Sequence, residues 1–349
     1  IGGQTNAFTT MENTCYHAKV MDSQVRTMVD ILSDIFLHSV FDANEIEKER
    51  PIIIQEIGMV EDNPEELIHI ISSKNYWGDH SLGRSILGHR ENILHFDAQT
   101  IRHFFYRFYQ PDRILITAAG NIEHNQLVDL LAAGFEAIQP SEDGFPPRTI
   151  PKGRNSVMVQ SKSLEQVHMC LSAPGIAMSD PDRFALSLLN TVLGGNMSSR
   201  LFQKIREVKG LAYTVYSFAS SYQDTGMFGV YTAVNPDQIQ TATELIIDEL
   251  LEMRQSEISI SELKDAKEYT KGNLYLASES PDNQMVRLAH NEFYFNRHVP
   301  LPEVIEKVEA ITVEQIHQLA QKHFATEKLA LSLLGPVQDA VFFDTSISE

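Results

Sequence analysis

Within residues 96–122, apolar positions at helical spacing predict a helix, and a short apolar strand that ends at Gly120 follows it. The same order recurs within residues 311–337, where a helix leads without a gap into an apolar strand that ends at Gly335. The offset between the two stretches is 215 residues throughout. A constant offset of this size indicates an internal repeat.

Two further observations support the repeat. Asp97 and Thr312 occupy equivalent positions, and each is a side chain that favours the N-cap of a helix. Residues 40–46 also resemble residues 257–263, at an offset of 217 residues. Similar helix joints can arise by chance, but two matches in register favour duplication of a whole domain.

Elsewhere the pattern predicts strands where apolar and polar residues alternate and helices where the apolar spacing is longer. The predicted strands cover 5–10, 14–20, 156–160, 166–171, 211–220 and 226–234, and the predicted helices cover 181–193, 198–208, 236–255 and 261–277. Both halves therefore belong to the α+β class, with helices packed on a mostly antiparallel sheet.

Proline and glycine mark the boundary between the halves. Residues 139–154 contain Pro140, Pro146, Pro147 and Pro151, a density that predicts an interdomain linker. The predicted domains are 1–138 and 155–349. Subtracting the offset of 215 from 155 places the start of the first domain about 60 residues before Ile1. We therefore expect the first domain to lack about 60 N-terminal residues here.

Composition narrows the class of protein. Of 349 residues, 43% are hydrophobic and 21% are charged, as in globular proteins, and no apolar stretch is long enough for a transmembrane helix. The formal charge of -19 disfavours a nucleic-acid partner. Two cysteines are too few for a disulfide framework. The compartment stays open, with a bacterial cytoplasm favoured, because any targeting segment before Ile1 is not visible.

Most simple catalytic motifs are missing. Gly194 and Gly195 resemble a turn between helices more than a phosphate-binding loop, and no Gly-x-Ser-x-Gly nucleophile motif is present. No two of the thirteen histidines have His-x-x-x-His spacing, so we expect them on the surface or at helix caps. These residues alone are not expected to form a catalytic zinc site.

Two carboxylates stand out. Glu49 and Glu56 are seven residues apart, which places them on one side of a continuous helix. Glu56 interrupts an apolar run, where a carboxylate needs a metal or a hydrogen-bond donor, whereas Glu49 matches a solvated acidic face. Pro51 lies between them and is expected to kink the helix or to begin a new segment.

Arg206 and Tyr213 are also seven residues apart, across the end of a predicted helix and the start of a strand. Such a pair could hold a carbonyl oxygen or an oxyanion. From spacing alone, ordinary surface packing is the favoured explanation.

Four segments in order resemble the pitrilysin/insulinase family of zinc metallopeptidases, which includes bacterial processing proteases and the mitochondrial processing peptidase. They are GGQTNAFT at 2–9, ERPIIIQEI at 49–57, HSLGRSILG at 80–88, and LGGNMSSRLF at 193–202 with Arg206 and GLAY at 210–213. Ser81 stands where the family has proline. The resemblance spans nearly the whole chain.

The resemblance implies a role for each matching residue. Glu56 matches the third zinc ligand and Glu49 the acidic residue that supports the site. Asn6, Ala7, Phe8 and Thr9 match an edge strand that pairs with extended substrate. Arg206 and Tyr213 match a pair that polarises the scissile carbonyl. The family's His-x-x-Glu-His motif, with two zinc ligands and the general base, is expected upstream of Ile1.

The implied protein is a zinc endopeptidase that binds one Zn²⁺ per intact chain. Its two domains would face each other as a clamshell and enclose unfolded peptides or presequences, and a homodimer or a heterodimer is compatible with this. The alternative is a non-catalytic family member that binds peptides or serves as a scaffold. The 349 residues alone are expected to have neither stoichiometric zinc nor peptidase activity.

Overall fold

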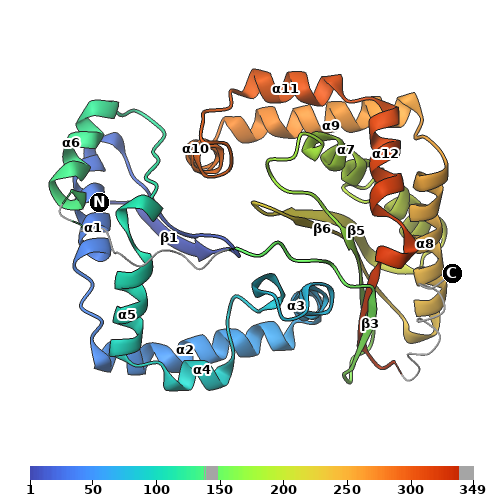
Figure 1. The fold of residues 1–349 in the computed structure, drawn as a ribbon, viewed down its shortest axis with the longest axis horizontal. Coiled ribbons are helices and arrows are strands. Elements are labelled where there is room, and N and C mark those ends of the chain that lie inside the picture. The colour runs from blue at the N-terminus through green and yellow to red at the C-terminus, as the bar shows by residue number, and fades with distance from the viewer. Residues whose placement is uncertain (137, 139–147, 338–349) are drawn as a thin grey trace. The chain divides into compact units, whose positions relative to one another are not determined.

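The computed structural model describes residues 1–136, 138 and 148–337 (Figure 1). They form two compact units, each built from separate stretches of the chain. Unit 1 comprises Ile1–Met59, Ser85–Arg148 and Ala277–His298, and unit 2 comprises Val60–Arg84, Thr149–Leu276 and Val299–Glu349. A compact unit is defined by contacts and a domain by an independent fold, so the predicted domain boundaries stay a prediction. Positions 139–147 of the predicted linker lie outside the described residues.

Unit 1 consists of an antiparallel hairpin and several helices. The hairpin strands are β1 (Gln4–Thr9) and β2 (Thr14–Lys19). The helices are α1 (Val25–Leu37), most of α2 (Ala43–Asp62), α4 (Arg90–His95), α5 (Ala98–Phe108), α6 (His124–Phe135) and α10 (Pro281–Phe295). α10 joins this unit through an ion pair between Lys19 and Asp282 at 2.7 Å and a hydrogen bond from Thr117 Oγ1 to the Met285 carbonyl at 3.1 Å.

Aromatic rings fill the space between the helices of unit 1. Phe36 of α1 contacts Phe105, Tyr109 and Phe135 at centroid distances of 5.4–5.8 Å. Tyr109 also shares a hydrogen bond of 3.1 Å with the hydroxyl of Tyr16 on β2. These contacts connect the hairpin, α1, α5 and α6.

The strand expected before Gly120 is absent, which corrects the prediction. Residues 114–119 follow no strand ladder, although Ile114 has extended dihedral angles. A strand requires a neighbour for its backbone groups, and in the described part of unit 1 only β1 and β2 pair. The equivalent residues in unit 2 form β7 (Ala330–Gly335), which pairs on both sides.

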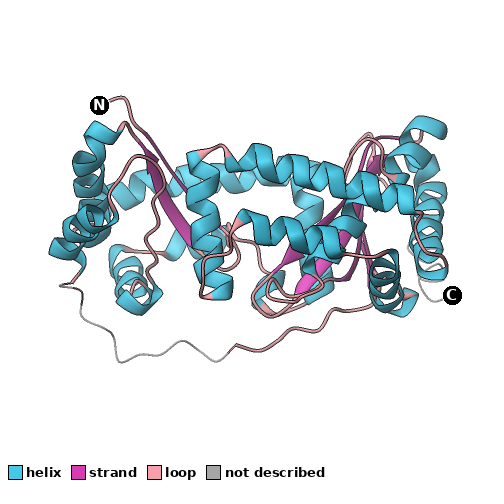
Figure 2. Ribbon diagram, turned by 90° about the horizontal axis from the view of Figure 1, so that it is seen from above, coloured by secondary structure: helices cyan, strands magenta, loops and turns pink. Residues whose placement is uncertain are grey.

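Unit 2 is a five-stranded sheet with helices on both faces (Figure 2). The strand order is β3-β7-β4-β6-β5, and only the pair β3 and β7 is parallel. The other strands are β3 (Ser156–Ser161), β4 (Val167–Pro174), β5 (Ala212–Ser221) and β6 (Gly226–Val234). The helices are α3 (Pro64–Trp77), α7 (Arg183–Leu193), α8 (Ile239–Gln255), α9 (Ile260–Ser278), α11 (Leu301–Ala310) and α12 (Val313–His323). The predicted α+β class is confirmed.

Alternating side chains give this sheet two buried faces. On β4, Met169 and Leu171 belong to the large core under α7, α8 and α12, whereas Cys170 between them faces Ile68 and Ile71 of α3. This is the twofold periodicity of a strand. Burial raises the pKa of the Cys170 thiol to about 11, so this cysteine is a core residue rather than a nucleophile.

A polar layer attaches α3 to the sheet. Asn75 of α3 is buried and donates hydrogen bonds to the Leu331 carbonyl at 3.0 Å and to Ser332 Oγ at 3.1 Å. The hydroxyls of Ser72 and Ser172 lie 2.7 Å apart. Because each of these groups is paired, their burial between helix and sheet is compensated by hydrogen bonds.

The observed helix limits agree with the repeat. The offset of 215 residues relates both ends of α5 to both ends of α12. The predicted caps are present, since the Asp97 side chain accepts from the Thr100 backbone N–H at 2.7 Å and Thr312 forms a capping box with Gln315. Among the helices of the described ranges, none combines the length and apolar character that a bilayer span requires.

Candidate active site

Helix α2 carries the two predicted carboxylates on one side. Over seven residues an α-helix completes nearly two turns, so Glu49 and Glu56 project in similar directions about 10 Å apart along the axis. Both are exposed, and neither forms a hydrogen bond or an ion pair with another described residue. Pro51 does not begin a new segment, since α2 is one helix from Ala43 to Asp62.

Arg50 holds this part of α2 in place. Its side chain is only 12% exposed and forms an ion pair with Glu47 at 2.6 Å. Its guanidinium donates to the carbonyls of Ile93 and Phe96, at the end of α4. Arg50 thus faces protein while the adjacent Glu49 faces solvent. Sequence reasoning overlooked this role, although Arg50 follows Glu49 in the matched ER pair.

The described residues do not complete a metal site. Catalytic zinc takes three protein ligands and a water, and no group of three or more His, Cys, Asp or Glu side chains lies close enough to hold an ion within the described ranges. Glu56 has suitable donor chemistry, because its carboxylate is exposed and unengaged there. These residues therefore offer one suitable ligand and not a full set.

Strand β1 presents its residues along a sheet edge. Asn6, Ala7, Phe8 and Thr9 all lie in β1 and are all exposed. The sheet has only two strands in the described part of the chain, so the side of β1 away from β2 has no strand partner, although the Ala7 backbone N–H donates to Asn6 Oδ1 at 2.8 Å. Such an edge can accept an extended peptide as a further strand.

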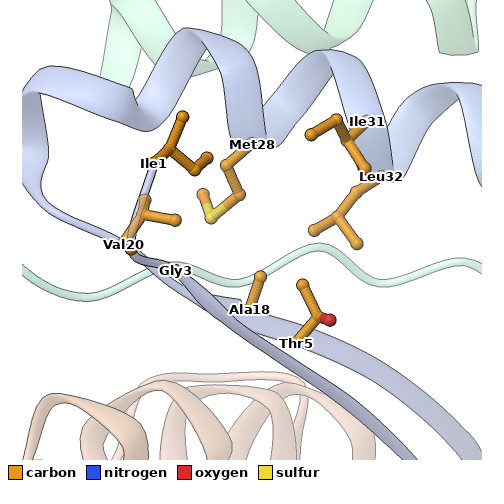
Figure 3. A pocket seen from close by; sticks show the side chains of 9 residues that line it. Ile1, Gly3, Thr5, Ala18, Val20, Met28, Ile31 and Leu32 are labelled. Carbon is orange, nitrogen blue, oxygen red and sulfur yellow. The ribbon is translucent and has the colours of Figure 1, made fainter.

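Hollows lie on both faces of this hairpin. A cavity of about 230 Å³ lies between the hairpin and α1, and Thr5 and Ala18 line it opposite Met28, Ile31 and Leu32 (Figure 3). A second hollow of about 190 Å³ is polar and is lined by Gln4, Thr5, Asn6, His17, Lys19 and Asp282. Successive side chains of β1 thus face an apolar and a polar surface in turn.

In unit 2, Arg206 and Tyr213 are in direct contact. The Arg206 guanidinium lies 4.5 Å from the Tyr213 ring centroid and 4.7 Å from that of Phe202. The cation is therefore stacked against two aromatic rings. Tyr213 is 78% exposed, which leaves its hydroxyl accessible to a ligand. Phe202 was not predicted as a site residue, although it lies four residues before Arg206.

Irregular backbone on each side positions this pair. The helix predicted over 198–208 begins at Arg200, and Phe202–Val208 is a π-helix (η4), which corrects the prediction. Gly210, with φ of +62°, then reverses the chain in a conformation that favours glycine. A register shift between Ala212 and Val215 interrupts the pairing of β5 with β6 at Tyr213. π-turns and bulges are frequent at functional sites.

The loop before η4 is fixed to the same strand. Gly194, in the predicted turn after α7, accepts a hydrogen bond from the Ser217 backbone N–H at 3.2 Å. A Cβ at Gly194 would lie 2.4 Å from that nitrogen, so only glycine allows the approach. The turn predicted at Gly194 and Gly195 is present, since α7 ends at Leu193.

The structure thus forms two groups of predicted site residues. Unit 1 contains Glu49 and Glu56 together on α2 and Asn6 to Thr9 on β1, and unit 2 contains Arg206 with Tyr213. That the two groups meet in one chamber stays a prediction.

The histidines are not all superficial, contrary to the prediction. His323 is 4% exposed and its Nδ1 lies 2.9 Å from the Pro174 carbonyl. His69 of α3 is partly buried, and its Nε2 lies 2.9 Å from the Tyr216 hydroxyl. Burial lowers the pKa of both imidazoles. They are enclosed because α3 and α12 pack on the sheet, which the spacing of histidines does not reveal.

Comparison with known proteins identifies the family. Residues 1–90 match the model of the insulinase family (peptidase family M16), and residues 95–269 match that of the peptidase M16 inactive domain. The chain is 40% identical over 338 residues to a Bacillus subtilis protein named as the uncharacterized zinc protease YmxG, covering 96% of this chain and 81% of the relative. A zinc protease of Streptomyces coelicolor is 33% identical over 347 residues, covering 97% of this chain and 75% of the relative.

Solved structures share the fold. A protease from Helicobacter pylori superposes with a TM-score of 0.88 at 20% identity, covering 95% of this chain and 82% of that chain. A chain of complex III from Candida albicans superposes with a TM-score of 0.87 at 17% identity, covering 99% of this chain and 85% of that chain. At these identities the likeness concerns the fold alone. Together with the sequence relatives and the two matched models, it confirms the predicted family: the chain belongs to the insulinase (M16) family of zinc proteases.

Proposed function

We propose that the full-length protein is a zinc-dependent endopeptidase that hydrolyses unfolded peptides. The observation that carries this proposal is the pair of exposed, unengaged carboxylates, Glu49 and Glu56, on one side of α2. Exposed carboxylates with no partner among the described residues are free to bind a cation, and two of them on one side of a helix concentrate negative charge there. Membership of a zinc protease family supports the same reading.

Glu56 would be a zinc ligand, and Glu49 would support the site electrostatically from two turns away. Since no full ligand set lies among the described residues, the remaining ligands would come from a His-x-x-Glu-His segment outside residues 1–349. Bound zinc would supply an acidified water as the nucleophile.

The edge of β1 would bind the substrate. A peptide that pairs with Asn6 to Thr9 must be extended, which favours unfolded chains over folded ones. Its alternate side chains would project toward the two faces of the hairpin, where the apolar and the polar hollow lie. Backbone pairing would supply affinity, and the hollows would favour particular side chains of the bound peptide.

Arg206 and Tyr213 would bind the carbonyl of the scissile bond. The guanidinium is always charged, and the phenol can donate a hydrogen bond to an oxygen that becomes negative in the transition state. Stacking between two rings fixes the cation before substrate arrives.

The test uses the full-length protein and an unstructured fluorogenic peptide. Glu56→Gln should abolish both bound zinc, measured by elemental analysis, and hydrolysis. Glu45→Gln, which changes an exposed carboxylate on the same helix, should retain both. Arg206→Ala should retain zinc and lower kcat about 100- to 1,000-fold. Zinc retained at full occupancy in Glu56→Gln would refute the assignment of the ligand.

The second candidate is a non-catalytic subunit. It is favoured by the fold that the chain shares with a chain of complex III. A full-length protein that binds no zinc and hydrolyses no unfolded peptide, yet forms a stable complex with other subunits, would support this candidate instead.

A further inference from the structure

A network of ion pairs attaches the helical segment that contains η4 to helices α8 and α9. Arg200, at the start of this helical segment, donates from Nε and Nη2 to the two carboxylate oxygens of Glu262 on α9, at 2.7 and 3.2 Å. Its third contact runs from Nη1 to Glu249 Oε1 on α8, at 3.2 Å. Bidentate arginine–carboxylate pairs fix direction as well as distance.

Glu249 is the buried member of the network. It is 4% exposed, and its second oxygen accepts from Lys204 Nζ at 2.9 Å. The hydrogen bond to Glu249 raises the pKa of Lys204. One carboxylate therefore joins Arg200 and Lys204 to α8, in an environment where an unpaired charge is costly.

Arg200 and Lys204 lie on one side of this short helical segment, and Phe202 and Arg206 lie on the opposite side. Residues four apart share a side, as do Arg200 with Lys204 and Phe202 with Arg206, whereas residues two apart point in opposite directions. The first pair faces α8, and the second presents the guanidinium stacked between Phe202 and Tyr213. The network thus determines the position of the helix from which Arg206 reaches its rings.

We propose that Glu249 is a positioning residue for Arg206: its carboxylate holds Arg200 and Lys204, and so keeps η4 in the geometry that stacks Arg206 on Tyr213. The consequence for catalysis rests on the proposed function of Arg206. The consequence for the stack does not. Glu262 contributes to the same support, but it also accepts from the Ser259 backbone N–H at 2.8 Å at the start of α9. Glu249 is therefore the cleaner residue to change.

The structure offers a matched control. Glu252 lies one turn further along α8, and its carboxylate is 3.9 Å from Arg200 and 4.0 Å from Lys204. Its side chain is 57% exposed. Glu249→Gln and Glu252→Gln remove the same charge from the same helix near the same cations, but only the first removes a buried carboxylate.

The first measurement reports the stack without any assay of activity. Ring currents from Phe202 and Tyr213 should displace the Arg206 Nε–Hε proton resonance upfield in the NMR spectrum of the full-length protein, with Arg206→Lys as the assignment standard. We expect Glu249→Gln to move this resonance toward the value of a free arginine and Glu252→Gln to leave it in place. An unmoved resonance in a folded Glu249→Gln variant would overturn the proposal.

The second measurement is a double-mutant cycle on peptide hydrolysis. Glu249→Gln should lower kcat about 10- to 100-fold with little change in KM, as expected for a misplaced catalytic group. In the Arg206→Ala background it should have no further effect, because the residue acts through Arg206. Equal effects in both backgrounds would overturn the proposal. If Arg206→Ala itself leaves kcat unchanged, the proposed function fails while the NMR result still decides the positioning role.

Should Glu249→Gln not fold, Lys204→Met removes a single partner of the carboxylate and leaves Arg200 paired. We expect a smaller displacement of the same resonance and a smaller loss of kcat. An unmoved Arg206 resonance in that variant would likewise overturn the proposal.

Discussion

Unit 1 and unit 2 support their site residues in different ways. In unit 2, η4 and β5 rest on a core that includes fully enclosed residues such as Leu189, Leu201 and Ile205. In the described part of unit 1, the buried apolar residues are Val29 and Ile57. Glu56 and the β1 edge therefore depend mainly on helix α2, on hydrogen bonds such as those of Arg50, on a two-stranded hairpin, and on partly exposed aromatic contacts such as that of Tyr16 with Tyr109.

This difference has consequences for dynamics. Segments with few buried apolar contacts open locally at low free-energy cost, while core elements open only with global unfolding. For residues 1–349 by themselves, we therefore expect amide hydrogen exchange to be fast in β1 and α4 and slow in β4, β6 and α7.

The largest expected effect is on the core of unit 2. Leu189→Ala removes a fully buried side chain of α7 and should lower the free energy of unfolding by about 2–5 kcal/mol. Leu94→Ala makes the same chemical change on α4 of unit 1, where the side chain is 56% exposed, and should change it by about 0.5 kcal/mol or less.

Urea unfolding followed by tryptophan fluorescence tests the first variant, because Trp77, the single tryptophan of the chain, is buried in α3 of unit 2. Hydrogen exchange of α4 peptides tests the second. Similar losses for the two leucines would contradict the contrast between the units.

A smaller loss is expected at the polar layer under α3. Asn75→Ala leaves the hydroxyl of Ser156, which donates to Asn75 Oδ1 at 2.7 Å, without that partner and removes two further bonds to β7. Unfolding free energy should fall by about 1–3 kcal/mol. Asn92→Ala on exposed α4 is the control and should be close to neutral. The Trp77 signal reports the first directly.

The two equivalent helix caps give a comparison at the same position of the repeat. Asp97→Ala at α5 and Thr312→Ala at α12 should each cost about 0.5–2 kcal/mol. α12 is packed on α7 and α8, so its exchange should remain slow after the change, whereas α5 should exchange faster along its first turn. If Thr312→Ala made exchange faster throughout α12 while Asp97→Ala left exchange in α5 unchanged, the conclusion that unit 1 opens more easily than unit 2 would be wrong.

What the sequence predicted was mostly local. The limits of α5 and α12 follow from apolar spacing and from the caps at Asp97 and Thr312, all within a few residues of one another. The strand at 114–119 was wrong, because pairing depends on a neighbour that local pattern does not contain. The prediction of the α+β class was still correct, because the predicted hairpins and the strand β7 are present.

The site was predictable only in part. Arg206 and Tyr213 were matched by family resemblance, and their contact at 4.5 Å is a property of the folded chain. The π-helix η4, which contains Arg206, depends on Glu249. This residue lies 49 positions beyond its partner Arg200, and no local sequence pattern indicates that the two are paired. The buried environment of His69 likewise results from the packing of α3 on strands that lie roughly 100 residues or more away.

The smallest expected effect is a change in the pH dependence of stability. His69 is surrounded by Tyr216, Tyr231, Phe218 and Glu65, and burial lowers its pKa below the ordinary value of 6.5, although the charge of Glu65 opposes the shift. The unfolded chain therefore takes up this proton first as the pH falls. The stability due to neutral His69 is complete above pH 6.5 and is lost as the pH drops through the lowered pKa.

His69→Gln cannot take up that proton and retains a polar group toward the Tyr216 hydroxyl. Its unfolding free energy, followed through Trp77 in urea between pH 7.5 and about pH 5, should fall less steeply than that of the wild type. The comparison concerns the slope, because any change that the substitution makes to the hydrogen bond or to packing shifts the unfolding free energy by the same amount at every pH. An identical slope would show that His69 is not held neutral in the folded protein, and that its surroundings are more open to water than their burial indicates.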